Sequence, residues 1–141
     1  MALDNIGESE ILQRLFSEIT ITPEVAREYG RKIPAWIQIL PASGNSKTRP
    51  EIRNLDPGEA SSIALALDLE NPLLIIDEKK GRRVAERLEI EMIGTVGVLI
   101  RAKNAGLIEE PQTLLSRLES VNFRLDENLR SMLTDVSERS S

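Results

Sequence analysis

The sequence of 141 residues contains no cysteine and no histidine. These absences exclude disulfides, thiol nucleophiles, zinc sites built from Cys and His, and histidine general bases. Aromatic residues are also rare, with one Trp, one Tyr and two Phe. Any catalysis must therefore depend on carboxylates, which are suitable ligands for a hard cation that prefers oxygen.

Long hydrophobic runs are missing as well. No window reaches the ~18 apolar residues of a transmembrane helix, and the chain does not open with a signal-peptide pattern. We therefore expect a cytoplasmic protein without membrane contact. The net charge of −5 argues against a general nucleic-acid coat, but not against a nuclease whose negative charge is concentrated in a metal site. The hydrophobic content of 40% favours one folded domain over residues 1–136, followed by a flexible tail over residues 137–141.

The most informative segment covers residues 55–85, with the sequence LDPGEASSIALALDLENPLLIIDEKKGRRVA. Asp56 and Pro57 have the residue types of a helix N-cap and a first helical position. A helical core stripe follows at i, i+3, i+4 and i+7. The apolar run over residues 73–76 predicts a strand buried on both faces, as in a parallel sheet. A second, basic helix then begins at Glu78.

The remaining elements follow from periodicity and from caps such as Thr22 and Gly30. Residues 41–50 form a loop with no packing face, which we expect to be mobile. The alternating order predicts a three-layer α/β/α fold with a mainly parallel sheet. The predicted helices cover 8–16, 23–29, 96–103, 111–121 and a last segment from Asp126, and the predicted strands cover 18–21, 36–40, 90–93 and 123–125.

Acidic residues stand where an α/β sheet commonly builds its site. Glu59 lies in the first turn of a helix, and Asp77 and Glu78 directly follow the buried strand. Lys79, Lys80, Arg82 and Arg83 come next, and a second basic group contains Lys47, Arg49 and Arg53. Acids beside a basic helix suggest a metal site that handles a phosphate polymer.

Structural interpretations of the same residues stay open. Glu59 is also a favourable acid at a helix N-terminus. Asp77 can serve as the N-cap of the helix that starts at Glu78, and Thr95 as the N-cap of the helix that follows it. Both basic groups can be solvated surface.

Four segments carry a resemblance to a known family. They are ALDNIGESEILQRLF, ITPEVAREYG, LDPGEASSIALAL with LLIIDEKKGRRVA, and IGTVGVLIRAKNAGLI. In this order they resemble the PIN-domain family, in particular a VapC-related group of predicted nucleic-acid-binding proteins. The resemblance implies a metal-dependent ribonuclease in which an acidic cluster binds Mg²⁺ or Mn²⁺. It also implies a homodimer, an RNA substrate and a small antitoxin partner.

The resemblance assigns roles by motif. Glu28 matches the family's second acidic position, Glu59 the third and Asp77 the fourth, and Glu78 is an accessory ligand. Through their charges, Lys79, Lys80, Arg82 and Arg83 would hold RNA phosphates. We therefore predict that the chain binds Mn²⁺ weakly, through Glu59 and Asp77.

The amino terminus departs from the family pattern. Members of this group begin with a strand that ends in Asp-Thr-Ser, whereas this sequence starts inside the following segment, and Asp4 does not replace the missing Asp. We therefore expect an impaired ribonuclease that lacks the first Asp-bearing strand. The alternative is a non-catalytic PIN-like module that binds nucleic acid or protein. In either case we expect dimerisation or a rearranged sheet, because unpaired sheet edges promote association.

Overall fold

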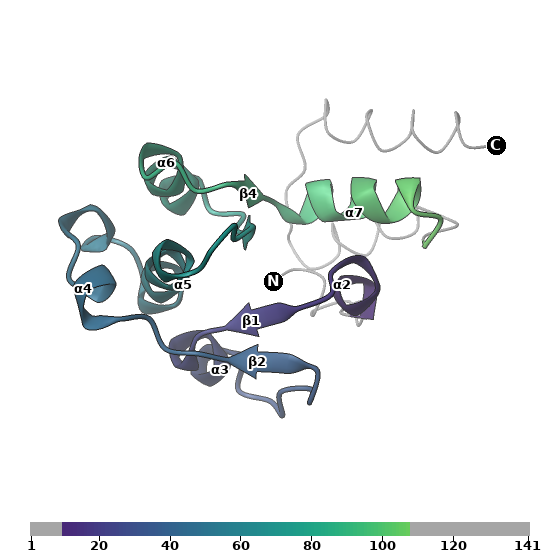
Figure 1. Cartoon of the computed structure of the whole chain (residues 1–141), viewed down its shortest axis with the longest axis horizontal. Helices are drawn as coiled ribbons and strands as arrows, with labels where there is room; N and C mark the ends of the chain where they lie inside the picture. Colours follow the sequence, from purple (N-terminus) through teal and green to yellow (C-terminus); the bar gives the residue numbers. More distant parts are fainter. Residues whose placement is uncertain (1–9, 108–141) are drawn as a thin grey trace. The chain divides into compact units, whose positions relative to one another are not determined.

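A computed structural model describes residues 10–107 of the chain (Figure 1). These residues fall into two compact units, of which the first contains residues 10–17 and 94–107 and the second contains Glu18–Ile93. The helices predicted over 111–121 and from Asp126, the strand at 123–125, the tail and the start of the chain lie outside the described residues. None of the helices between residues 10 and 107 is long and apolar enough to cross a bilayer.

The first unit pairs two helices, α2 (Glu10–Leu15) and α7 (Thr95–Asn104), which pack against each other. Ile11 and Leu12 of α2 are buried, as are Val98 and Leu99 of α7. Adjacent residues lie about 100° apart around a helix, which is within the width of an apolar stripe, so each pair can pack toward the other helix.

The second unit contains two βαβ segments and a central helix. Strand β1 (Ile19–Ile21) leads through α3 (Pro23–Tyr29) to β2 (Ile37–Ile39). The chain then forms α4 (Gly44–Lys47), the 3₁₀-helix η1 (Pro50–Ile52) and α5 (Pro57–Asp68). A second segment follows, with β3 (Leu74–Ile75), α6 (Lys79–Arg87) and β4 (Met92–Ile93).

The strands pair in parallel, as the βαβ connections require. Ile19 of β1 lies opposite Ile37 of β2, and Leu74 of β3 lies opposite Met92 of β4. The prediction of an α/β fold with parallel strands is therefore confirmed. Within the described residues the strands form two sheets of two strands each, so one edge of each strand has no partner strand there.

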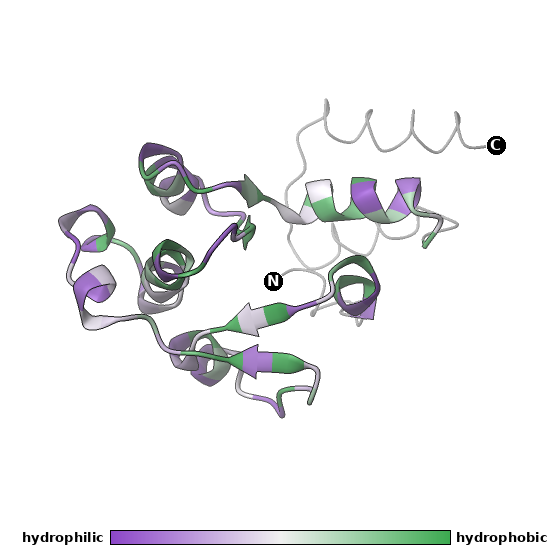
Figure 2. Cartoon of the chain, viewed as in Figure 1, coloured by the Kyte–Doolittle hydropathy of each residue, from purple (hydrophilic) through white to green (hydrophobic). Residues whose placement is uncertain are grey.

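Helix α5 forms the centre of the apolar core (Figure 2). Ile63 and Ala64 have no exposed surface, and Ala85 of α6 is equally buried. In strand β3 and the residues beside it, Leu74 and Ile76 are buried whereas Ile75 is only half-buried. The strand is thus covered completely on one face and partly on the other, which is less than the sequence predicted.

The segment 41–50 differs from its prediction. It contains a one-turn helix, α4, which packs on α5, and Ala42 and Ser46 are buried. Ser43 caps this helix by accepting a hydrogen bond from the Ser46 N–H. The prediction of a loop without a packing face was wrong, because small polar residues can hold a turn through side-chain caps where no apolar stripe exists.

Two predicted caps were also wrong. Helix α6 begins at Lys79, so its N-cap is Glu78 and not Asp77. Helix α7 begins at Thr95 itself, and its N-cap is Gly94. The predicted caps Thr22 and Asp56 are confirmed, since their side chains accept hydrogen bonds from the Val25 and Glu59 N–H groups.

Candidate metal and RNA site

The first turn of α5 is the centre of the candidate site. Asp56 caps this turn, since its Oδ1 accepts a hydrogen bond from the Glu59 N–H at 3.0 Å. Pro57 has no N–H to donate, and the Gly58 N–H donates to Glu28 Oε1 at 3.1 Å. Two carboxylates therefore satisfy the free N–H groups that a helix N-terminus would otherwise leave without partners.

Glycine at position 58 makes room for Glu28. Gly58 is buried, and a Cβ atom there would come within 2.8 Å of Glu28 Cδ. No side chain fits in that space while the Glu28 carboxylate keeps its hydrogen bond. The glycine of the Pro-Gly-Glu motif therefore places Glu28 beside the first turn of α5.

A buried pair of hydroxyl groups also joins α3 to α5. Ser61 Oγ donates to the Gly58 carbonyl at 2.9 Å and lies 2.6 Å from Thr22 Oγ1. Because the Ser61 proton is used for Gly58, Thr22 is the donor in that pair. The N-cap of α3 and the first turns of α5 are thus fixed together, and this connection sets where Glu28 can reach.

The side chain of Glu59 extends from α5 toward α6. Its Oε2 atom would stand 3.2 Å from a Cβ atom on Gly81, so α6 approaches it closely. Partial burial, followed by the negative charge of Asp56, raises the pKa of Glu59 from 4.5 to about 7. The carboxylates of Glu78 and Glu28 and a hydrogen bond with Asp56 add to this increase.

Asp77 and Glu78 lie between β3 and α6 and are both exposed. Glu78 acts on Glu59 through its charge, and it is the N-cap of α6 without a side-chain cap hydrogen bond. The structure therefore brings Glu28, Asp56, Glu59 and Glu78 into one electrostatic group, which we call the acidic cluster. Asp77 directly precedes Glu78 at the end of the strand.

Two of the four basic residues predicted to bind RNA make structural contacts. Lys80 Nζ donates to the Asn54 carbonyl at 2.9 Å, and Arg82 Nη1 donates to the Ile76 carbonyl at 2.8 Å. Arg82 thereby holds the end of the strand that leads to Asp77. Lys79 and Arg83 are both exposed to solvent.

The donor type of the acidic cluster fits a hard divalent cation, and so does its uncompensated negative charge. The carboxylates of the cluster do not form a complete set of metal ligands in this conformation, because among residues 10–107 no three acids are grouped closely enough to hold a metal ion. Electrostatic repulsion acts over longer distances than metal ligation. Three carboxylates can therefore raise the pKa of Glu59 without lying close enough to share a cation. A cation would have to draw the side chains together.

Sequence reasoning missed two features of this site. The sequence pattern indicates only a helix cap at Asp56, although among the neighbouring carboxylates Asp56 has the largest effect on the pKa of Glu59. The Asp-x-x-Glu spacing of Asp56 and Glu59 was the available signal, since a cap and a third helical position face each other. The contact between Glu28 and Gly58 joins positions 30 residues apart and leaves no local signal.

The family model of a PIN domain matches residues 1–138. No curated protein and no solved structure gives a match. The chain belongs to the PIN-domain family. It thus has the fold of a nuclease family whose members generally use divalent metal ions and interact with nucleic acid.

Proposed function

We propose that this PIN domain is a Mg²⁺- or Mn²⁺-dependent endoribonuclease that hydrolyses RNA phosphodiesters. The observation that carries the proposal is the pKa of Glu59, which partial burial and the other carboxylates of the acidic cluster raise to about 7. A carboxyl group with a strongly shifted pKa beside other carboxylates is typical of functional sites. The repulsion among these carboxylates destabilises the start of α5, and a structural role as helix caps does not explain why so many acids gather there.

Each residue has a proposed role. Glu59 and Asp77 would hold the cation, Glu28 would join them on leaving the Gly58 N–H, and Glu78 would be an accessory ligand. When bound, the cation supplies charge neutralisation and a more acidic water. Lys79 and Arg83 would position RNA phosphates, while Lys80 and Arg82 would do so alongside their carbonyl contacts.

Cleavage of a mixed panel of structured RNAs in Mn²⁺ tests the proposal. The wild-type chain should cleave, and both Asp77→Ala and Glu59→Gln should lose cleavage. A chelator should abolish the wild-type activity. Equal cleavage by the wild type and both variants would assign the activity to a contaminant and overturn the proposal.

A second candidate is a non-catalytic module that binds nucleic acid or protein. The favouring observation is that the Glu28 carboxylate is already used by the Gly58 N–H, in a cluster without ligand spacing among the described residues. RNA binding without cleavage at any Mn²⁺ concentration would favour this candidate over the nuclease.

The proposed nuclease would act in the cytoplasm as the toxin of a toxin–antitoxin pair, as a homodimer. In the part of the chain that the structure describes, β1 and β3 each have an edge without a partner strand, and open edges favour association. Light scattering tests the dimer, and a monodisperse monomer would contradict it. Inhibition of cleavage by a small co-expressed protein would test the antitoxin.

A further inference from the structure

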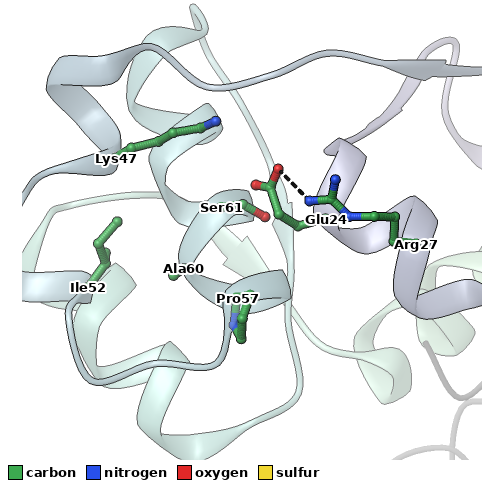
Figure 3. A pocket seen from close by; sticks show the side chains of 7 residues that line it. All are labelled: Glu24, Arg27, Lys47, Ile52, Pro57, Ala60 and Ser61. Carbon is green, nitrogen blue, oxygen red and sulfur yellow. Dashed lines mark ion pairs between the residues drawn. The ribbon is translucent and has the colours of Figure 1, made fainter.

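A pocket of about 340 Å³ lies among α3, α4, η1 and α5 in the second unit (Figure 3). Its volume is within the range of small-molecule sites. Glu24 and Arg27 line it from α3, Lys47 from α4 and Ile52 from η1. None of these residues belongs to the acidic cluster, so the proposed metal site does not account for the pocket.

The floor of the pocket is apolar and offers little hydrogen bonding. Ile52 is buried, and Pro57 and Ala60 of α5 lie beside it. The hydroxyl of Ser61 also lines the pocket, but its proton is donated to the Gly58 carbonyl. Such a floor suits a flat ring that buries its face and presents its polar edge to the rim.

The rim carries three charges. Lys47 extends over the pocket from α4, while Glu24 and Arg27 stand together at the opposite side (Figure 3). The Lys47 side chain makes no hydrogen bond or ion pair with the described residues, and Arg27 lies 3.5 Å from Glu24 with 74% of its side chain exposed. An ion pair with one partner this exposed contributes little to stability, so Arg27 and Glu24 can exchange partners easily.

Lys47 differs from its neighbour in the same basic group. Arg49 donates twice to Glu51 Oε2, at 3.1 Å and 2.6 Å, which commits its charge to that carboxylate. Lys47 is exposed and has no such partner among the described residues, so its ammonium group is available to a ligand. The rim therefore offers one cation without a partner among the described residues, one exchangeable cation and one carboxylate with two oxygens that can act as acceptors.

We propose that this pocket binds a single unpaired guanosine nucleotide of RNA. The base would lie on the apolar floor, Lys47 would contact its phosphate, and Arg27 would stack on the base. The Watson–Crick edge of guanine has two adjacent N–H donors, which match the two oxygens of Glu24. Adenine, cytosine and uracil lack two adjacent donors on that edge, so the carboxylate prefers guanine.

The pocket lies next to the acidic cluster along the same two helices. Glu24 and Glu28 are one turn apart on α3, about 6 Å along the axis. Pro57 lines the pocket, and its neighbour Gly58 contacts Glu28. A strand with a phosphate at the acidic cluster would therefore place a nearby nucleotide in the pocket. The choice of RNA as ligand rests on the proposed function.

Binding of short single-stranded RNAs without metal tests the inference, because no cleavage occurs. Fluorescence anisotropy would compare oligoribonucleotides with one central G, A, C or U. The wild type should prefer G, and Glu24→Gln should lose that preference by about tenfold while binding the other RNAs as before. Lys47→Ala should weaken all four and reduce the salt dependence. Arg53→Ala, an exposed cation of the same basic group outside the pocket, is the matched control.

The outcomes separate this inference from the proposed nuclease. Equal binding of all four RNAs by the wild type, or an unchanged G preference in Glu24→Gln, would overturn the guanosine site even if Mn²⁺-dependent cleavage is intact. Effects of Arg53→Ala equal to those of Lys47→Ala would overturn it too, since they indicate general charge attraction. The predicted pattern in a protein that cleaves no RNA would support the pocket and reject the nuclease. Melting temperatures of the variants exclude unfolding as the cause.

Discussion

The two ends of α5 each place a carboxylate beside a helix N-terminus, and the surroundings of these carboxylates are opposite in kind. At the last residue of α5, Asp68 accepts hydrogen bonds from the Ser43 N–H, the Ser43 hydroxyl and the Ser46 hydroxyl, at 2.6, 2.8 and 2.6 Å. The Ser46 and Ser43 donors lower the pKa of Asp68 from 3.8. In its charged form, the Asp68 carboxylate therefore stabilises α4.

Glu59, at the other end of the helix, is surrounded by acceptors. Burial and neighbouring carboxylates raise its pKa to about 7. The charged form of Glu59 therefore lowers the stability of the folded state. Asp68 thus stabilises the folded state, whereas the charged form of Glu59 destabilises it. A costly charge beside other acids is a stronger indication of function than a satisfied one, and the following predictions test this distinction.

The largest expected effect is on RNA cleavage. Glu59→Gln removes a proposed cation ligand while keeping the side-chain volume, and we expect at least about a hundredfold loss of Mn²⁺-dependent cleavage. Asp68→Asn is the matched control at the other end of α5 and should cleave normally per folded molecule. Equal losses in both variants would mean that the two carboxylates do not differ in function.

The second effect is on stability. Asp68→Asn removes the charged acceptor of three hydrogen bonds and leaves the α4 cap without its partner, so we expect a loss of about 1–2 kcal/mol in the free energy of unfolding. Urea denaturation measures this, with Glu70→Gln as an exposed control close by in the sequence. If Asp68→Asn unfolds at the same urea concentration as the control, the hydrogen bonds contribute nothing measurable.

The same contrast explains what the sequence could predict. Caps and periodicity are local, so the helix at 57–68 and its start at Asp56 could be read directly. The helix α4 could not, because it depends on Asp68, which is more than 20 residues away from Ser43 and Ser46. The caps of α6 and α7 were misplaced by one residue, because neither true N-cap residue, Glu78 or Gly94, makes the side-chain hydrogen bond that a cap pattern predicts.

The site was predictable to a similar extent. Motif position alone selected Glu59, and the structure surrounds it with acids. The placement of Glu28 depends on a contact between α3 and α5 that no periodicity encodes. Among the cations, no local pattern distinguishes Lys80 and Arg82, which bind backbone carbonyls, from Lys79 and Arg83.

A third and smaller effect is the pH dependence of stability. The Glu59 carboxyl titrates at 4.5 when unfolded and at about 7 when folded, so the folded state binds more protons between these values. The contribution of Glu59 to stability must therefore fall as pH rises from 4.5 to about 7, by at most about 3 kcal/mol. Because solvent screens a partly exposed group, we expect about 1 kcal/mol. Urea denaturation across this range should give a flatter profile for Glu59→Gln.

Asp68 provides the internal control for that profile. Its pKa lies below 3.8 in the folded state, so its stabilising contribution is present above 3.8 and is lost as pH falls through the folded value. The slope due to Asp68 therefore has the opposite sign and a different pH window. A wild-type profile that remains as steep in Glu59→Gln would assign the slope to other groups.

The smallest effect is the proton that a cation would displace. With a pKa of about 7, Glu59 is about half protonated at pH 7, so binding of Mn²⁺ through Glu59 should release about half a proton. Calorimetry in buffers of different ionisation enthalpy measures this release. It should disappear in Glu59→Gln and persist in Asp68→Asn, while Asp77→Ala should bind more weakly. Equal affinity in Asp77→Ala would exclude Asp77 as a ligand, and undiminished proton release in Glu59→Gln would place the cation away from the acidic cluster.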